Sequence, residues 1–183
     1  MTADPRSGDA QSTTYCLGFL FTNDRKNVVL VEKARPEWQR GKLNGAGGHV
    51  EVGERPSEAM SREACEELNT DANLQWLPFA VMDGPDWIVY CYRAFSTPNA
   101  EWADGAGDDE PVGLYEIDQI DAVPCLPNLS WLIPLALDKN VRSTTIINHG
   151  GNRYPLDLIA RDSMPAAEYF ALIRDISTTR PSA

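Results

Sequence analysis

Three glutamate residues stand close together in a segment whose periodicity predicts a helix, residues 56–68. Glu63, Glu66 and Glu67 are spaced i, i+3, i+4, so a helix brings their carboxylates to neighbouring positions on one face. Like charges so placed repel one another, whereas a divalent cation between them reverses the sign of that interaction. Oxygen-only ligands suit Mg²⁺ or Mn²⁺. A solvated acidic face is the alternative interpretation of the same residues.

The residues in front of this helix favour a functional site. A glycine cluster at residues 45–48 precedes it, and glycine allows the backbone to approach a ligand closely. Glu54 stands at the start of the predicted helix. Arg62 lies among the acids, and we expect it to pair with Glu54 or Glu66 and so hold a carboxylate in place.

The segment from Gly48 to Thr70 resembles the Nudix box, the signature of a family of hydrolases that act on a nucleoside diphosphate linked to another group. That box reads G-x5-E-x7-R-E-U-x-E-E-x-G-U, where U is a bulky aliphatic residue. Its glycine and charged positions up to the paired glutamates are matched by Gly48, Glu54, Arg62, Glu63, Glu66 and Glu67. Ala64 and Thr70 replace aliphatic residues, and Asn69 replaces the final glycine. Asparagine is the next best residue after glycine for a left-handed helix end.

The resemblance implies an α+β fold, a Nudix-type α/β/α sandwich around a mixed β-sheet. It also implies which residues bind metal. The ligands carried over are the carboxylates of Glu63, Glu66 and Glu67 and the carbonyl of Gly48. Family members often add one acid from a distant loop, and we expect Glu110 in that role. Asp104, Asp108 and Asp109 belong to the same acidic loop.

The resemblance implies hydrolysis of a phosphoanhydride by water, with Mg²⁺ or Mn²⁺ as the cofactor. Either Glu63 or Glu67 is expected to be the catalytic general base. Glu54 and Arg62 are expected to orient the loop and the ligating glutamates at the catalytic centre.

The charge of the chain restricts its partners. With 16 basic and 27 acidic residues the net charge is −11, which repels phosphate backbones and anionic lipid. A nucleic acid polymer or a membrane surface is therefore not expected as a partner. A small nucleotide is expected, with cations neutralising its phosphates.

Two segments outside the Nudix box bear on which nucleotide is preferred. Residues 43–48 read Leu-Asn-Gly-Ala-Gly-Gly, with Trp38 upstream, and resemble the W-N-G-x-G-G sequence of MutT-like nucleoside triphosphate pyrophosphohydrolases. Asn128 and Leu129 stand where purine-sanitising relatives carry two base-reading aspartates, so an 8-oxopurine preference lacks support. The expected reaction converts a (deoxy)nucleoside triphosphate to its monophosphate and pyrophosphate. The residues expected to contact substrate are Trp38, Asn44, Gly47, His49, Asn128 and Trp131.

Other interpretations remain open. ADP-ribose or a nucleotide sugar is the chief competing substrate. A non-catalytic Nudix-fold regulatory module that binds a nucleotide is an alternative of another class. The tryptophans are either base-stacking platforms or packing residues. His49 either touches a phosphate or flanks the metal site.

The remaining sequence predicts the elements that position these residues. Expected strands cover 13–21, 28–32, 74–83, 87–95, 112–117 and, less regularly, 144–148; expected helices cover 56–68, 128–140 and 166–176. The first two strands form a hairpin, and the first helix buries Met60, Ala64 and Leu68 along one stripe. Strands alternate with helices, which favours an α+β layered domain.

The chain divides into a frayed terminus at 1–12, a Nudix hydrolase domain at 13–140, and an extension at 141–183. The extension is expected to pack on the domain or at a dimer contact, in a monomer or homodimer. The four cysteines lack the spacing of a metal site, and reduced thiols are expected. Without an apolar leader or a long apolar stretch, the chain is expected in the cytoplasm.

Overall fold

A seven-stranded mixed sheet lies at the centre of the structure, a computed structural model that describes residues 12–96, 110–141 and 145–150. The strand order is β3-β2-β1-β5-β4-β7, and β6 pairs with β2 beside this path. The strands are β1 (Thr13–Thr22), β2 (Asn27–Lys33), β3 (Lys42–Asn44), β4 (Leu77–Asp83), β5 (Trp87–Ser96), β6 (Val112–Glu116) and β7 (Thr145–Asn148). β1 is parallel to β5 and β4 to β7, whereas the other pairs are antiparallel.

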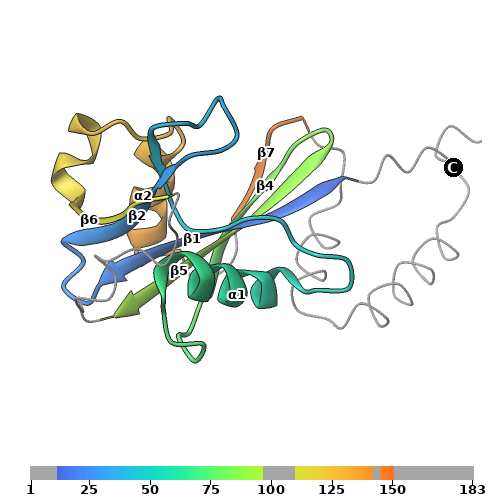
Figure 1. Ribbon diagram of the computed structural model, residues 1–183, viewed down its shortest axis with the longest axis horizontal. Helices are drawn as coiled ribbons and strands as arrows, with labels where there is room; N and C mark the ends of the chain where they lie inside the picture. The colour runs from blue at the N-terminus through green and yellow to red at the C-terminus, as the bar shows by residue number, and fades with distance from the viewer. Residues whose placement is uncertain (1–11, 97–109, 142–144, 151–183) are drawn as a thin grey trace, which may run out of the picture.

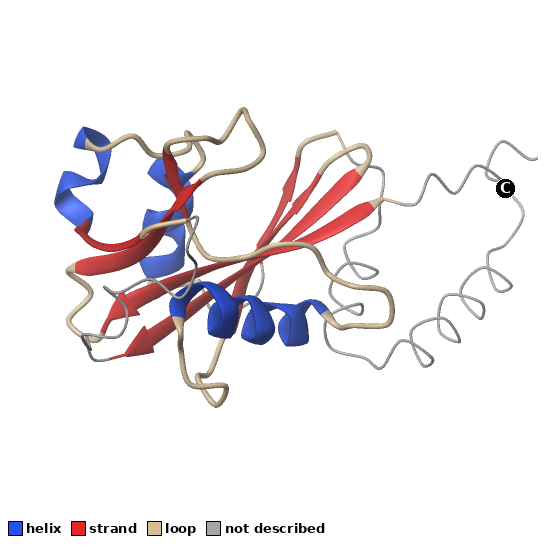
Figure 2. Cartoon of the chain, in the orientation of Figure 1, coloured by secondary structure: helices blue, strands red, loops and turns tan. Residues whose placement is uncertain are grey.

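Helices cover both faces of this sheet (Figures 1 and 2). α1 (Pro56–Leu68) packs on one face, while α2 (Leu129–Leu137) and the 3₁₀ helix η2 (Ile117–Ala122) contribute to the core on the other. β1 supplies both layers because successive side chains of a strand point to opposite faces. Cys16 and Leu20 join the α1 side, whereas Leu17 and Phe19 join the α2 side. The α/β/α layering around a mixed sheet is therefore confirmed.

α1 begins and ends as its sequence predicts. Pro56 occupies its first turn, and the Arg55 N–H donates to the Glu58 carboxylate over 2.9 Å, which satisfies a free N–H at the helix start. Asn69 closes the helix in the left-handed conformation, with φ 50° and ψ 39°. The stripe containing Met60 is buried against the sheet.

A close approach between α1 and β1 depends on a glycine. A Cβ at Gly18 would lie 2.6 Å from the Met60 sulfur and 2.7 Å from the Trp76 ring. The helix packs in the space that the missing side chain leaves, so the glutamates on α1 lie close to the central strands.

The glycine-containing loop 45–50 takes the place beside β1 that β2 leaves. β2 pairs with β1 only near Leu20 and Phe21. Further back, the Gly18 N–H donates to the Ala46 carbonyl over 2.7 Å, and the Cys16 N–H donates to the Gly48 carbonyl over 2.9 Å. The loop is thus bonded to the sheet like an extra strand, although it is mostly irregular.

The predicted strands and helices that fall in the described ranges are present, α1 with the predicted ends and the others with shifted ends, and β1 and β2 form the expected hairpin. Two short elements, β3 and η2, were not expected. The predicted helix at 166–176, most of the terminus at 1–12 and all but the first residues of the extension lie outside the described residues. Among the described helices, none combines the length and apolar character needed to cross a membrane.

Arg93 on β5 fixes the C-terminal end of α2. Its guanidinium donates to the carbonyl of Ala136 and, over 3.0 Å, to the carbonyl of Val141. Carbonyls at a helix end lack partners within the helix, and a cation there also suits the helix dipole. Arg93 therefore holds α2 on the sheet.

Replacing Arg93 with methionine should destabilise the protein by about 2–3 kcal/mol, because hydrogen bonds from a charged donor are lost at a partly buried position. Urea unfolding would measure the change in free energy. The control is Arg40→Met, which removes an exposed ion pair with Glu37 and should cost about 0.5 kcal/mol or less. Equal effects of the two substitutions would contradict the anchoring role of Arg93.

Candidate active site

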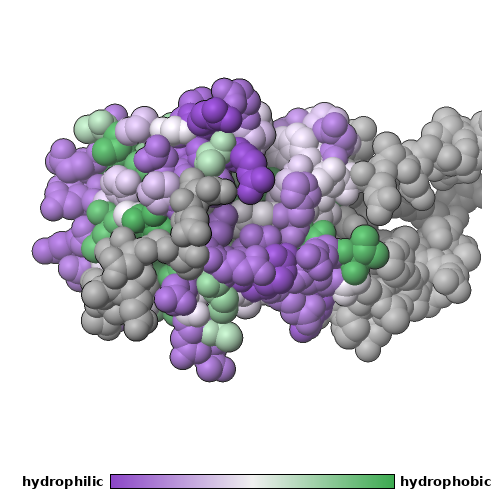
Figure 3. Space-filling view, in the orientation of Figure 1, coloured by the Kyte–Doolittle hydropathy of each residue, from purple (hydrophilic) through white to green (hydrophobic). Residues whose placement is uncertain are grey.

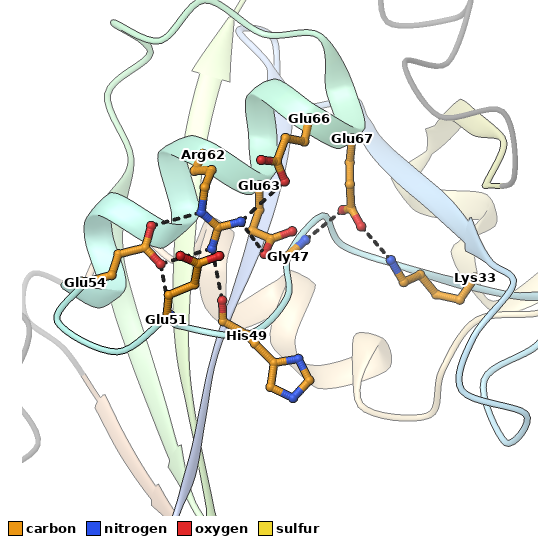
Figure 4. A network of polar contacts seen from close by, with 9 residues as sticks. All are labelled: Lys33, Gly47, His49, Glu51, Glu54, Arg62, Glu63, Glu66 and Glu67. Carbon is orange, nitrogen blue, oxygen red and sulfur yellow. Dashed lines mark hydrogen bonds and ion pairs between the residues drawn. The ribbon is translucent and has the colours of Figure 1, made fainter.

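Glutamates from α1 and from two loops meet around two basic side chains. Figure 4 shows those of α1 and of the loop before it. Arg62 is at the centre of one group and Lys33 at the centre of the other. Hydrophilic residues cover the surface over α1 in the space-filling view (Figure 3). The helix therefore presents a polar outer face while its opposite stripe is buried.

Arg62 joins the loop before α1 to the acids on the helix. It binds the Glu54 carboxylate with two hydrogen bonds of 3.0 Å each, and it also donates to the His49 carbonyl over 3.0 Å. The same guanidinium lies 2.8 Å from Glu63 and 3.3 Å from Glu66. Both partners expected for Arg62 are present, and a planar guanidinium makes such a two-pronged contact well.

Lys33, the last residue of β2, lies between two acids that are distant in sequence. Its ammonium nitrogen is 2.8 Å from Glu67 Oε1 and 2.6 Å from Glu110 Oε2. The remaining oxygens accept backbone N–H groups, that of Gly47 for Glu67 and that of Ala34 for Glu110, both over 2.8 Å. Glu110 is thus brought into the same cluster as the α1 glutamates.

Glu63 rests against the backbone of Gly48. A Cβ at Gly48 would lie 2.5 Å from Glu63 Oε1, so the carboxylate uses space that only glycine leaves. The Gly48 carbonyl, the expected metal ligand, accepts the Cys16 N–H. A carbonyl oxygen has a second lone pair, and that is the one left for a further contact.

Burial and ion pairing set the electrostatics of the site. The hydrogen bonds from Arg62 hold the pKa of Glu54 below its usual value, and those to Glu54 raise the pKa of Arg62. Burial raises the pKa of Glu67 despite its ion pair with Lys33. Burial opposes the charged forms of Glu110 and Lys33 too, yet their contact lowers the pKa of Glu110, and the two carboxylates together raise the pKa of Lys33.

As the described side chains stand, no group of three or more His, Cys, Asp or Glu residues is arranged to hold a metal ion. The reason lies in the contacts, because Lys33 stands between Glu67 and Glu110 and Arg62 binds Glu63 and Glu66. The oxygens are present, but the protein's own cations occupy them.

The residues expected to bind substrate fall into two sets. Gly47 and His49 belong to the loop beside β1, where the His49 ring lies 4.4 Å from the Tyr15 ring. Asn44 is the last residue of β3 and its side-chain oxygen accepts the Gly45 N–H. Trp38 lies in the β2–β3 connection and is 65% exposed, which leaves its indole available for stacking.

Asn128 and Trp131 belong to the second set, at the start of α2. Trp131 packs against the core on the α2 face, so it is not brought to the glutamates. Asn128 follows a segment that contacts β3, because Leu43 pairs with Cys125 just upstream. A cleft of about 260 Å³ lies here, and its lining includes Pro127 and Leu129, the two neighbours of Asn128, but not Asn128 itself.

The acids Asp104, Asp108 and Asp109, which share the loop of Glu110, lie outside the described residues. Lys33 was missed by the sequence analysis. The alternation of side chains along β2 could have revealed it. Val29 and Val31 point to the face that α1 covers, and Lys33 is the next residue on that face. A lysine that continues a buried face needs an acid partner.

A family model, the NUDIX domain, matches residues 14–130. Among curated proteins, the methanol dehydrogenase activator of Bacillus methanolicus is 32% identical over 105 residues, which cover 56% of this chain and 56% of that protein. The match thus spans about half the length of this curated relative.

Solved structures share the fold. The NUDIX domain of NrtR from Shewanella oneidensis, complexed with ADP ribose, has a TM-score of 0.57 at 18% identity, covering 74% of this chain and 92% of that one. A NUDIX-family hydrolase from Clostridium perfringens has a TM-score of 0.56 at 22% identity, covering 70% of this chain and 97% of that one. At these identities the likeness is one of fold.

Alanine at two adjacent glycines should have unequal effects. Gly47 has a φ of 148°, and a Cβ there would lie 2.2 Å from the Cys16 carbonyl oxygen, so Gly47→Ala should cost about 3 kcal/mol or more. At Gly48 the Cβ meets the movable end of Glu63, so Gly48→Ala should cost about 1 kcal/mol or less. Urea unfolding of both variants checks this. A greater loss at Gly48 would show that the loop is not fixed on β1 as described.

Proposed function

The chain belongs to the Nudix family of hydrolases, which act on nucleoside diphosphate derivatives, and on that premise we propose that it is a metal-dependent nucleotide pyrophosphohydrolase. The proposed reaction converts a (deoxy)nucleoside triphosphate and water to the monophosphate and pyrophosphate. Water forms the new bond to phosphorus, the phosphoanhydride bond breaks, and pyrophosphate leaves.

One observation carries this proposal. Glu110, from a segment remote in sequence, shares the ammonium of Lys33 with Glu67 of α1, at 2.6 and 2.8 Å. A solvated acidic face does not account for two carboxylates that are each about four-fifths buried and fixed by backbone N–H groups. Partly buried acids with fixed positions are typical of functional sites.

The donor set fits a hard divalent ion. Nudix hydrolases generally use divalent metal ions. Every proposed ligand offers oxygen, namely the carboxylates of Glu63, Glu66, Glu67 and Glu110 and the carbonyl of Gly48, as Mg²⁺ and Mn²⁺ prefer. When bound, such an ion would neutralise phosphate charge and make water a better nucleophile.

The protein's own residues have separate tasks in this proposal. Arg62 keeps Glu63 and Glu66 in position and ties both to the loop through Glu54. The Gly47 N–H orients Glu67. The proton of the attacking water passes to Glu63 or Glu67, each of which rests against the glycine loop.

For the nucleoside we propose the region where β3 meets the start of α2. Asn44 and Asn128 come from these two neighbouring segments, and amide side chains suit hydrogen bonding to a base edge. The cleft of about 260 Å³ lies beside Asn128, whose neighbours Pro127 and Leu129 line it. Exposed Trp38 is a candidate to stack on the base, and His49 to contact a phosphate.

ADP-ribose or a nucleotide sugar remains the competing substrate. The NrtR NUDIX domain, which shares the fold, is described as complexed with ADP ribose. A nucleotide-binding module without turnover is the alternative of another class. The complete set of box glutamates argues for turnover.

We also propose a cytoplasmic location. Cys16, Cys65, Cys91 and Cys125 are all free thiols, as is usual in a reducing compartment. Assembly as a monomer or homodimer stays a prediction.

Pyrophosphate release from nucleoside triphosphates should require Mg²⁺ or Mn²⁺ and stop when EDTA is added. Its measurement needs the eight common triphosphates, 8-oxo-dGTP, ADP-ribose, NADH and a nucleotide sugar. Release of monophosphates from ADP-ribose but not of pyrophosphate from triphosphates would select the competing substrate. Turnover that survives EDTA would contradict metal dependence.

Replacing Glu67 with glutamine should lower turnover by roughly 100-fold or more, with a much smaller change in nucleotide binding, because a ligand and candidate base is lost. The matched control is Glu58→Gln on the same helix, where glutamine can still cap the Arg55 N–H and activity should be kept. Steady-state kinetics and calorimetric nucleotide binding separate the two effects. Nucleotide binding without turnover in the unaltered protein would indicate the regulatory module.

A further inference from the structure

Lys33 and Arg62 differ in the partners that their charged groups bind. Arg62 also bonds the His49 carbonyl and Glu54, so it is anchored to the loop independently of the proposed metal ligands. The ammonium of Lys33 bonds Glu67 and Glu110, and these are the partners found for it among the described residues. Both of them are proposed ligands.

The side chains of Lys33 and of its two carboxylate partners are mostly buried. The Lys33 side chain is 10% exposed, and those of Glu67 and Glu110 are each 19% exposed. Two carboxylates this close to one another repel in a partly dry setting unless a positive charge stands between them. Lys33 supplies that charge through its contacts with both carboxylates, of which the one with Glu67 is drawn in Figure 4.

A divalent ion would need the same oxygens. In each of the two carboxylates, one oxygen accepts a backbone N–H group: Oε2 in Glu67 and Oε1 in Glu110. The other oxygen of each carboxylate accepts the Lys33 ammonium, and a metal ion would compete for it. A lysine side chain is a flexible stem with a compact charge, and it can leave without disturbing the strand. Arg62, with its several fixed bonds, has no such freedom.

We propose that Lys33 is a built-in competitor of the divalent ion, which neutralises Glu67 and Glu110 in the metal-free protein and is displaced when the metal binds. This inference rests on the proposed function, since it takes both glutamates as metal ligands. It makes the metal affinity lower than the carboxylates alone would give. It also makes the metal-free fold stable on its own.

Replacing Lys33 with methionine tests this, because methionine keeps an unbranched stem of similar length without the charge. Mn²⁺ binding measured by calorimetry should tighten roughly tenfold. The melting temperature of the metal-free variant should fall by roughly 5–10 °C, and added Mn²⁺ should raise it more than it raises that of the unaltered protein.

The matched control is Lys139→Met, in the turn that follows α2, the helix on the opposite face of the sheet from α1. The Lys139 side chain is exposed, and its ammonium forms no ion pair within the part of the chain that the structure describes. The same change of net charge there should leave Mn²⁺ affinity within about twofold of the unaltered value, because a distant exposed charge is screened.

A second measurement uses the unaltered protein and so does not depend on the folding of a variant. Acetylation of Lys33 by acetic anhydride, followed by peptide mass spectrometry, should be slow without metal. It should accelerate with saturating Mn²⁺, because the displaced ammonium loses both partners. Lys139 serves as the internal reference, with an unchanged rate.

Unchanged or weaker Mn²⁺ affinity in Lys33→Met, or acetylation of Lys33 that does not respond to Mn²⁺, would overturn the competition while leaving the proposed function intact. Failure of the unaltered protein to bind Mn²⁺ at all would instead overturn the proposed function, and this inference with it.

Discussion

Charge balance among crowded carboxylates is the constraint on which the site depends. Arg62 compensates three of them and Lys33 two, in a chain whose net charge is −11. The two cations do so differently, since Arg62 on α1 also bonds the loop through the His49 carbonyl, whereas acids are the partners of Lys33 among the described residues. The helix can therefore carry acids on one face and still pack its opposite stripe into the core. Fold stability and chemistry are thus coupled through the same ion pairs.

The backbone of the glycine loop is the second support of the site. It bonds to β1 on one side and, through the Gly47 N–H, to Glu67 on the other. Gly47 and Gly48 are adjacent, but a side chain at each would meet a different neighbour. At Gly47 a side chain would meet the backbone of β1, whereas at Gly48 it would meet the Glu63 carboxylate. One short segment thereby fixes two of the three α1 glutamates against the sheet.

Much of the fold follows from local sequence signals. The β-rich run of β1, which is buried on both faces, and the stripe with Met60 on α1 are strong signals, and Asn69 ends the helix as its type favours. β3 was missed because three residues are too few to show alternation, and its pairing with β2 is a tertiary contact. In the site, the spacing of Arg62 and the glutamates was readable, but Lys33 needed the knowledge of which face β2 buries. The sequence around Glu67 or Glu110 does not indicate that both bind Lys33, because that contact joins segments far apart in the chain.

The pairing of loop 45–50 with β1 has a consequence for how the chain can vary. Side chains along an extended segment alternate between faces, so a single inserted residue would turn Ala46 out of the core and leave a glycine, which has no side chain, in its place. Loss of the pairing would uncover the backbone N–H and carbonyl groups of β1, and unpaired strand edges recruit strands from other molecules. The segment that positions the acids thus also protects the protein from aggregation, and its length is fixed for both reasons.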